Sequence, residues 1–281
     1  MHVFVTGATG YIGSAVVREL IGAGHTVTGL FRSEEGAAKL KEAGAEALNG
    51  TLTDLETLRA AAAAADGVIH LAFTNDFSDF EGALALDMGA VEAIGEALEG
   101  SGKPFITTSH ANGEAVNAAV IALSGRGVRS AVVSLAPSVH GEGDRGFVPM
   151  MIHIARDKGF AAYIGDGTNR WPAVHRLDAA VLYRLALESA PAGSRLMGAG
   201  DEGIPLREIA ETIGRHLEVP AQSLTADEAA GHFGFLGPIA ALDLSGLYGI
   251  PQTSRQTQAL LGWEPVQPGL IADLEQGHYF V

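Results

Sequence analysis

The sequence contains no cysteine, which excludes disulfide bonds, thiolate metal ligands and a cysteine nucleophile. Basic residues are scarce as well: 18 lysines and arginines stand against 33 aspartates and glutamates, for a formal net charge of −15. Such a surface repels a phosphate backbone, and no basic cluster offsets the repulsion, so nucleic-acid binding is not expected. No apolar run is long enough to span a bilayer, and residues 2–5 are typical of a strand rather than of a signal peptide. Composition therefore predicts a cytoplasmic protein without membrane or nucleic-acid partners.

What the sequence does contain is a regular alternation of strand-like and helical segments over its first half. This alternation predicts an α/β fold with a Rossmann-type, doubly wound parallel sheet. Ser33 is placed to cap one helix, and Thr53 opens a capping-box pattern, Thr-Asp-Leu-Glu, for another. The expected strands are residues 2–5, 26–30, 45–48, 67–72, 104–108 and 130–135, and the expected helices are residues 14–23, 34–43, 53–65, 80–99 and 113–124.

The alternation loosens after Pro137, and we interpret the second half as a smaller C-terminal substrate lobe on the carboxyl side of the sheet. Its helical patterns cover residues 147–158, 178–189 and 206–217, and a loop is expected at 165–172. The predicted division is a Rossmann domain at residues 1–135, to which 172–197 return, and a smaller lobe formed by residues 136–171 and 198–281.

The first strand leads into a glycine turn, Thr6-Gly7-Ala8-Thr9-Gly10-Tyr11-Ile12-Gly13. Gly7 permits the tight turn, Gly10 lets the backbone approach a pyrophosphate, and Gly13 lets helix and strand pack closely. The free N–H groups at the helix start then face the phosphates. Because the turn lies at the first strand–helix junction of an alternating pattern, we interpret it as a dinucleotide site rather than an ordinary turn. The expected cofactor contacts here are Gly7, Thr9, Gly10, Tyr11, Ile12 and Gly13.

The end of the second strand indicates which dinucleotide is bound. An acidic residue there would bind the ribose hydroxyls of NAD(H), whereas an arginine suits the 2′-phosphate of NADP(H). The chain has Arg32 and Ser33 at this point, with no acidic residue before Glu34. A guanidinium clamp with an added hydroxyl favours NADP(H) over NAD(H). The alternative for Arg32 is a solvated surface side chain.

Taken together, these segments resemble the extended branch of the short-chain dehydrogenase/reductase superfamily, the epimerase/dehydratase-like proteins, over nearly the whole length. The similar segments are residues 5–13, 68–72 (Val-Ile-His-Leu-Ala), 137–143, 164–167 with 171–178, and 261–265 (Leu-Gly-Trp-Glu-Pro). Thr51 stands where the family has an acid that contacts adenine, which implies a weakened contact, while Leu52 can still pack on the ring. The resemblance implies cofactor contacts at Leu52, Leu71, Ala72, Phe73, Thr107, Thr108, Pro137 and Val139.

The resemblance breaks at the catalytic signature. The family uses a serine or threonine after the fifth strand and a Tyr-x-x-x-Lys on the next helix, where the lysine lowers the pKa of the tyrosine. None of the tyrosines at 11, 163, 183, 248 and 279 has a lysine four residues later. The strand passes into the helix almost at once, where the family has a long active-site loop. That loop is either deleted or missing from the sequence as written, and the chain resembles atypical members that keep the glycine turn but lack the usual active-site residues.

Two residues after the fifth strand are the catalytic candidates. Ser109 matches the hydroxyl position of the family and can polarise a carbonyl, or it is a strand-end serine that caps local backbone. His110 is the nearest titratable group and can act as an acid near neutral pH, or it is a turn residue. Neither alternative is decided by the sequence.

Substrate contacts are expected in two places. Thr74 and Asn75 follow the fourth strand, at the carboxyl edge where open α/β sheets bind ligands. Arg170, Trp171 and His175 lie in the lobe segment, where an arginine beside a tryptophan suits an anionic or planar group, although Trp171 also fits a lobe core. His140 is interpreted as structural. No histidine or carboxylate spacing indicates a metal site.

Two functions follow from these observations. The first is an NADPH-dependent oxidoreductase that reduces a small carbonyl, enone or imine substrate with an atypical active site. The second is a non-catalytic NADP(H)-binding sensor or scaffold, because a fold can survive the loss of its chemistry. A homodimer is expected through helices 80–99 and 113–124, which carry many small apolar residues.

Overall fold

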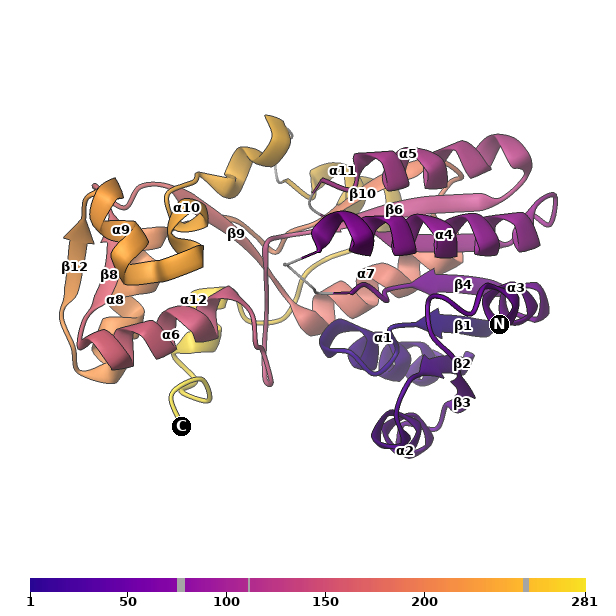
Figure 1. The fold of residues 1–281 in the computed structure, drawn as a ribbon, viewed down its shortest axis with the longest axis horizontal. Helices are drawn as coiled ribbons and strands as arrows, with labels where there is room; N and C mark the ends of the chain where they lie inside the picture. The colour runs from indigo at the N-terminus through magenta and orange to yellow at the C-terminus, as the bar shows by residue number, and fades with distance from the viewer. Residues whose placement is uncertain (75–78, 111, 250–252) are drawn as a thin grey trace. The chain divides into compact units, whose positions relative to one another are not determined.

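The computed structural model describes residues 1–74, 79–110, 112–249 and 253–281 and divides into two compact units. Each unit has its own sheets and its own hydrophobic core (Figure 1). The first unit consists of Met1–Ser134, Ala179–Leu196 and Gln256–Trp263. The second unit consists of Leu135–Asp178, Met197–Arg255 and Glu264–Val281.

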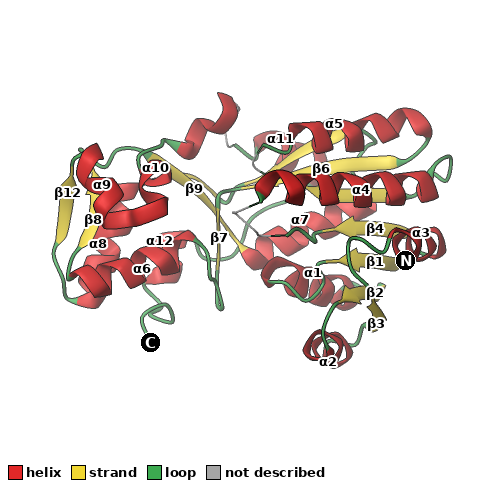
Figure 2. Ribbon diagram, in the orientation of Figure 1, coloured by secondary structure: helices red, strands yellow, loops and turns green. Residues whose placement is uncertain are grey.

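A seven-stranded sheet with the order β10-β6-β5-β4-β1-β2-β3 forms the centre of the first unit (Figure 2). Its strands from β3 to β6 pair in parallel, as the predicted α/β fold requires. The order reverses direction at β1, so the carboxyl ends of β1 and β4 border the place where such sheets bind ligands. The strands are β1 (His2–Thr6), β2 (Thr26–Phe31), β3 (Glu46–Asn49), β4 (Gly67–His70), β5 (Pro104–Thr108), β6 (Arg129–Leu135) and β10 (Ser194–Gly198).

Helices cover both faces of this sheet, which explains why all four residues of β4 are buried and why the strand lacks polar alternation. One face carries α3, α4 and α5, whose buried residues share a core with the sheet. The other carries α1, which is joined to α7 by an ion pair from Arg184 to Glu19 at 2.7 Å. The helices are α1 (Tyr11–Gly22), α2 (Glu34–Glu42), α3 (Leu55–Ala64), α4 (Phe80–Leu98), α5 (Glu114–Ala122), η1 (Leu123–Arg126), α7 (Arg176–Ser189) and α11 (Arg255–Leu261).

Two helix caps were predicted, and only one is present. The hydroxyl of Ser33 accepts a hydrogen bond from Gly36 N at 3.2 Å and caps α2, which confirms that prediction. The capping box at Thr53 is wrong. The N-cap of α3 is Asp54, and its side chain accepts hydrogen bonds from Thr51 instead of capping the helix. The helix therefore begins one residue later than the capping box requires, and the carboxylate of Asp54 is engaged by the preceding loop.

The second unit is built around two small sheets, with the orders β11-β9-β7 and β12-β8. Its core surrounds Trp171, which contributes no exposed surface. The strands are β7 (Ser138–His140), β8 (Ala161–Ile164), β9 (Arg170–His175), β11 (Asp201–Pro205) and β12 (Ala221–Leu224). The helices are α6 (Phe147–Lys158), α8 (Leu206–Leu217), α9 (Ala226–Phe233), η2 (Gly234–Leu236), α10 (Gly237–Ala240), η3 (Leu244–Gly249) and α12 (Leu270–Leu274).

The unit boundaries differ from the predicted domain boundaries at two places. Residues 172–178 belong to the second unit, because β9 pairs with β11 and with β7 rather than with the large sheet. Residues 256–263, which were assigned to the lobe, belong to the first unit. The expected loop at 165–172 also contains the start of β9. Across the part of the chain that the structure describes, no helix combines the length and the apolar character needed to cross a membrane.

Candidate functional site

The glycine turn between β1 and α1 brings backbone against backbone. Gly7 has a positive φ of 65°, and a Cβ there would lie 2.6 Å from the backbone nitrogen of Ala72. A Cβ on Gly13 would lie 2.0 Å from the carbonyl oxygen of Gly7. Neither position tolerates a side chain, because the obstructing atoms are backbone. The turn ends at Gly10, which is the N-cap of α1 and has no side chain to cap it. The helix begins at Tyr11, three residues before the predicted start at Ser14.

This turn fits the diphosphate of a dinucleotide. The first N–H groups of α1 have no partner within the helix, and the positive end of the helix dipole favours an anion at that point. The contacts predicted at Gly7, Thr9, Gly10, Tyr11, Ile12 and Gly13 all come from this one segment. A cradle that a single Cβ would fill is the shape that a close backbone–phosphate approach needs.

The end of β2 supplies groups suited to a further phosphate. Arg32 is exposed and makes no hydrogen bond or ion pair to any residue that the structure describes. The hydroxyl oxygen of Ser33 accepts from Gly36 N, which leaves its proton free to be donated. The methyl group of Thr9 lies 3.3 Å from the position of a Cβ on Gly36, so the glycine turn and α2 meet here.

Leu52 and Thr51 lie on the loop after β3. Leu52 is half-buried and packs against the core shared by the sheet and α3, α4 and α5. The hydroxyl of Thr51 donates to Asp54 at 2.9 Å and its backbone N–H donates to the same oxygen at 2.7 Å. Thr51 is therefore occupied within its own loop.

A buried polar chain connects the glycine turn to the end of β4. The N–H of Ala72 donates to Thr6 Oγ1 at 3.2 Å, and Thr6 Oγ1 lies 2.7 Å from His70 Nδ1. On the other side of the ring, His70 Nε2 lies 2.9 Å from Asp87 Oδ1. A carboxylate only accepts, so His70 Nε2 carries a proton towards Asp87, while Thr6 Oγ1 accepts from the N–H of Ala72. This network fixes the backbone of Leu71 and Ala72 beside Gly7.

Sequence reasoning missed this network, although a signal was present. Asp87 is the single acid on the buried face of α4, where Ala83, Ala90, Val91 and Ile94 precede or follow it at helical spacing. Such a buried carboxylate requires a partner, because an unpaired charge in an apolar core is costly. The partner, His70, lies in a segment that the sequence analysis assigned only to a strand.

The end of β5 brings the two catalytic candidates together with Phe73. Ser109 extends the strand by donating its N–H to Val133 O at 2.8 Å. The ring of His110 stacks on Phe73, with centroids 3.9 Å apart and planes inclined by 21°. Burial lowers the pKa of His110; the nearby Asp87 acts to raise it, and His70 acts to lower it further. Ser109, His110 and Phe73 thus come from the ends of two neighbouring strands, β4 and β5.

The hydroxyl of Ser109 does not cap local backbone. Its oxygen accepts a hydrogen bond from Asn117 Nδ2 on α5 at 2.8 Å. The neighbouring Thr108 is 2.6 Å from the hydroxyl of Tyr183, a fully buried side chain whose pKa is raised by burial. A phenol with a raised pKa is poorly suited to proton transfer near neutral pH, so Tyr183 does not replace the missing family tyrosine.

Three further predicted contacts, Thr107, Thr74 and Asn75, add little to the description of the site. The hydroxyl of Thr107 is buried and has no partner among the described residues. Thr74 is half-buried. The predicted substrate residue Asn75 lies outside the residues that the structure describes.

The remaining predicted site residues all belong to the second unit. Pro137 directly precedes β7 and Val139 lies on it. Arg170, Trp171 and His175 lie on β9. Trp171 packs edge-on against Phe147 at 5.6 Å in the core of the unit. Its neighbour Arg170 points to the exposed side of the same strand and donates to Gly203 O at 2.9 Å.

Because neighbouring residues of a strand face opposite sides, Arg170 and Trp171 do not form one recognition surface. The burial of Trp171 leaves the proposed stacking on a substrate without support and matches the alternative of a core residue. His175 accepts a hydrogen bond from Leu177 N at 3.2 Å and lies edge-on to His140. His140 itself pairs with Asp273 at 2.8 Å, both buried, which agrees with a structural role.

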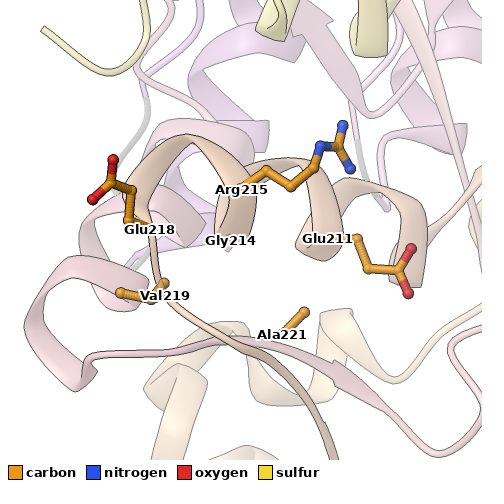
Figure 3. Close-up of a pocket in the computed structure, with 6 residues that line it drawn as sticks. All are labelled: Glu211, Gly214, Arg215, Glu218, Val219 and Ala221. Atoms are coloured by element: carbon orange, nitrogen blue, oxygen red, sulfur yellow. The ribbon is translucent and has the colours of Figure 1, made fainter.

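A surface pocket at the end of α8 contains none of the predicted site residues (Figure 3). It is lined by Glu211, Gly214, Arg215, Glu218, Val219 and Ala221. The guanidinium of Arg215 is already paired with Glu275 at 2.5 Å, and the other two charged residues that line the pocket, Glu211 and Glu218, are acidic. The described residues also contain no group of three or more histidine, aspartate or glutamate side chains placed to hold a metal ion. The first unit therefore offers the better candidate site.

Comparison with known proteins agrees with this geometry. A family model described as the NAD dependent epimerase/dehydratase family matches residues 3–87. The uncharacterized protein C2A9.02 of Schizosaccharomyces pombe is 46% identical over 301 aligned residues, which cover 100% of both chains. Since this chain has 281 residues, at least 20 of the 301 aligned positions have no counterpart in it.

Two further proteins are similar over most of their length. The 4-hydroxy-2-methyl-3-oxo-4-farnesyl-3,4-dihydroquinoline-1-oxide ketoreductase of Stigmatella aurantiaca is 27% identical to this chain. The alignment covers 83% of this chain and 80% of the ketoreductase. Among solved structures, dTDP-glucose 4,6-dehydratase of Bacillus anthracis in complex with NAD aligns with a TM-score of 0.71 at 14% identity. That alignment covers 99% of this chain and 95% of the dehydratase, and it shows a shared fold.

Proposed function

Because the chain belongs to the NAD-dependent epimerase/dehydratase family of short-chain dehydrogenase/reductase-like proteins, we propose that it is an NADPH-dependent reductase of a small carbonyl compound. The observation on which this proposal depends is the pairing of two features in one unit. A backbone cradle at Gly7 and Gly13 fits a dinucleotide, and a hydroxyl and an imidazole, Ser109 and His110, end the strand next to β4.

The residues of the first unit divide the work of holding the cofactor. The N–H groups that open α1 bind the diphosphate, while Leu52 packs on the adenine side. Arg32 and Ser33 bind the 2′-phosphate, since Arg32 has no competing partner in the described part of the chain and Ser33 has a free proton. The acidic first turn of α2 opposes this phosphate only in part, because Glu35 is paired with Lys39 at 2.7 Å.

When bound, the dinucleotide supplies a hydride for the carbonyl carbon. Ser109 donates its hydroxyl proton in a hydrogen bond to the carbonyl oxygen, where negative charge develops. His110 in its protonated form transfers a proton to that oxygen and is protonated again from solvent, so that the ketone gains one hydride and one proton and becomes an alcohol. Phe73 holds the imidazole through the ring stack.

A ketone is the preferred substrate among the carbonyl, enone and imine classes. The Stigmatella relative is a ketoreductase by name, and its alignment spans most of both chains. Reduction of a ketone also needs an acid at the carbonyl oxygen, and the pair of Ser109 and His110 supplies it. Reduction of an iminium ion would need no such acid. We therefore place small ketones first in a substrate panel and use 3-oxo esters to represent them.

The test measures oxidation of NADPH and NADH with such a panel, together with calorimetric titration of both cofactors. We expect turnover with NADPH, and Arg32→Ala should weaken NADPH binding about 10- to 100-fold, the range for one hydrogen bond to a charged group. NADH binding should change little. Arg18→Ala removes another exposed arginine of the first unit and serves as the control. Equal losses for both cofactors would contradict the phosphate assignment.

A non-catalytic NADP(H)-binding protein is the second candidate. The absence of Tyr-x-x-x-Lys favours it, and the raised pKa of Tyr183 makes the phenol beside Thr108 poorly suited to act as the acid. Binding of NADPH with no turnover on any ketone, enone or imine would support this function over the reductase.

A further inference from the structure

Asn117 is a buried polar residue on α5 that the mechanism above does not use. Its Nδ2 donates to the Oγ of Ser109 at 2.8 Å, across the short connection between β5 and α5. Its neighbours on the same helix face, Val116 and Val120, are apolar and buried. An amide in such a place has a desolvation cost that an aliphatic side chain would not have, so its hydrogen bonds need an explanation.

The bond to Ser109 fixes the orientation of the amide, because its NH2 end and not its carbonyl end points at Oγ. Glu114, three residues earlier on α5, is held by Arg195, which donates to both of its carboxylate oxygens at 2.8 and 3.3 Å. Hydrogen bonding from Arg195 first, and from Asn117 as well, lowers the pKa of Glu114 below its ordinary value. A carboxylate only accepts, so its presence agrees with the orientation in which the NH2 group supplies the proton to Ser109.

This arrangement determines the direction in which the hydroxyl of Ser109 donates. The oxygen of Ser109 receives a proton from Asn117, so its own proton cannot point to Asn117 and is free for another acceptor. A hydroxyl that accepts one hydrogen bond also becomes a better donor, because the bonds polarise one another. If the amide were reversed, the hydroxyl would donate to it and be lost to a substrate.

We propose that Asn117 is a positioning residue that makes the Ser109 hydroxyl an obligate donor to the substrate carbonyl. The inference rests on the proposed reductase function and extends it to a buried residue of α5 that the mechanism above does not use.

Asn117→Asp gives the sharpest test, because it keeps the shape of the side chain and removes its ability to donate. The hydroxyl of Ser109 then donates to the carboxylate. We expect kcat for a 3-oxo ester to fall about 10- to 100-fold, somewhat less than the loss of a whole oxyanion donor, with the KM for NADPH unchanged. Ser109→Ala should lose as much, and the double variant should lose no more than Ser109→Ala alone.

A second readout does not depend on turnover. The dissociation constant of the 3-oxo ester in the complex with NADP+, in which no hydride is available, should rise in Asn117→Asp and in Ser109→Ala alike. Asn117→Leu serves if the aspartate variant does not fold, since it neither donates nor accepts. Val120→Ala is the control, because it weakens the packing of α5 and should lower Tm without changing kcat.

The outcomes separate this inference from the proposed function. An active wild-type enzyme with an equally active Asn117→Asp variant overturns the positioning role and leaves the reductase standing. Additive losses in the double variant also overturn it. A wild-type protein that binds NADPH but turns over no ketone overturns both proposals.

Discussion

His110 is surrounded by groups that pull its protonation in opposite directions. Burial against Phe73 disfavours the charged imidazolium, whereas the carboxylate of Asp87 favours it. The first effect is the larger, so the pKa of His110 lies below its ordinary value and the ring is mostly neutral at pH 7. A carbonyl reduction that uses this residue as its acid must therefore depend on a minor, protonated population.

The pH profile tests this role. The protonated fraction of His110 increases as pH falls, so kcat/KM for ketone reduction should rise as pH falls through a pKa below about 6.5, the ordinary value for histidine. His110→Gln should lose this limb, and His153→Gln, which changes an exposed histidine of the second unit, should keep it. A profile that is flat below pH 7 in the wild-type protein would show that His110 is not the acid.

For single residues, the sequence predicted which side chains follow the ends of the strands but not which groups those side chains contact. Ser109 and His110 follow from the strand pattern and the family resemblance, because both depend on local position. The partner of Ser109, Asn117, and the neighbours of His110, Asp87 and His70, come from other elements. Such contacts require the fold, since no local periodicity tells which buried polar groups meet.

Elements were predicted well where one segment carries its own signal. Six of the seven strands of the large sheet were predicted from their own segments, and α6 and α8 have the predicted bounds, because a long amphipathic stripe identifies a helix. The short strands β7, β8, β10, β11 and β12 were missed, and the start of β9 was assigned to a loop. Strands of three to six residues depend on partners distant in sequence, which a single-segment pattern does not contain.

The link between β4 and α4 provides a prediction about elements. Asp87→Leu leaves His70 Nε2 buried without its partner and should lower the free energy of unfolding by about 3 kcal/mol, the usual cost of breaking a buried pair from one side. Asp87→Asn keeps an acceptor for the same N–H and should cost less. Denaturant unfolding measures both, and the double variant His70→Leu/Asp87→Leu should be more stable than Asp87→Leu. Equal stability of Asp87→Leu and the wild-type protein would contradict a structural pair.

For the molecule as a whole, composition predicts properties such as the net charge, which belong to no single helix or strand. The net charge of −15 means that the anionic cofactor is bound against the overall field, by groups close to it. The division into two units was expected from the change of pattern after Pro137, but the crossing of the chain between them at 178–179 and 255–256 was not. The sheet pairing of β9 decides the first of these crossings, and pairing partners are not encoded in composition.

Self-association is the remaining prediction for the whole molecule, and it concerns the outer faces of α4 and α5, which lie side by side (Figure 1). Ala85 and Leu86 on α4 and Ala115, Ala118 and Ala122 on α5 are exposed, and small side chains allow two such helix pairs to approach closely. We expect a homodimer through this face. The acidic protomers repel one another, so the dimer fraction should increase with salt, which screens the repulsion.

Light scattering at low and high ionic strength measures this association. Leu86, which is 39% exposed, should be buried at the dimer interface, so Leu86→Glu should give a monomer with an unchanged Tm for unfolding of the isolated chain. Leu260 on α11 is 49% exposed and lies outside the proposed face, so Leu260→Glu is the matched control and should remain dimeric. A wild-type protein that stays monomeric at every salt concentration would refute the interface, because screening removes the only long-range force that opposes contact between these apolar faces.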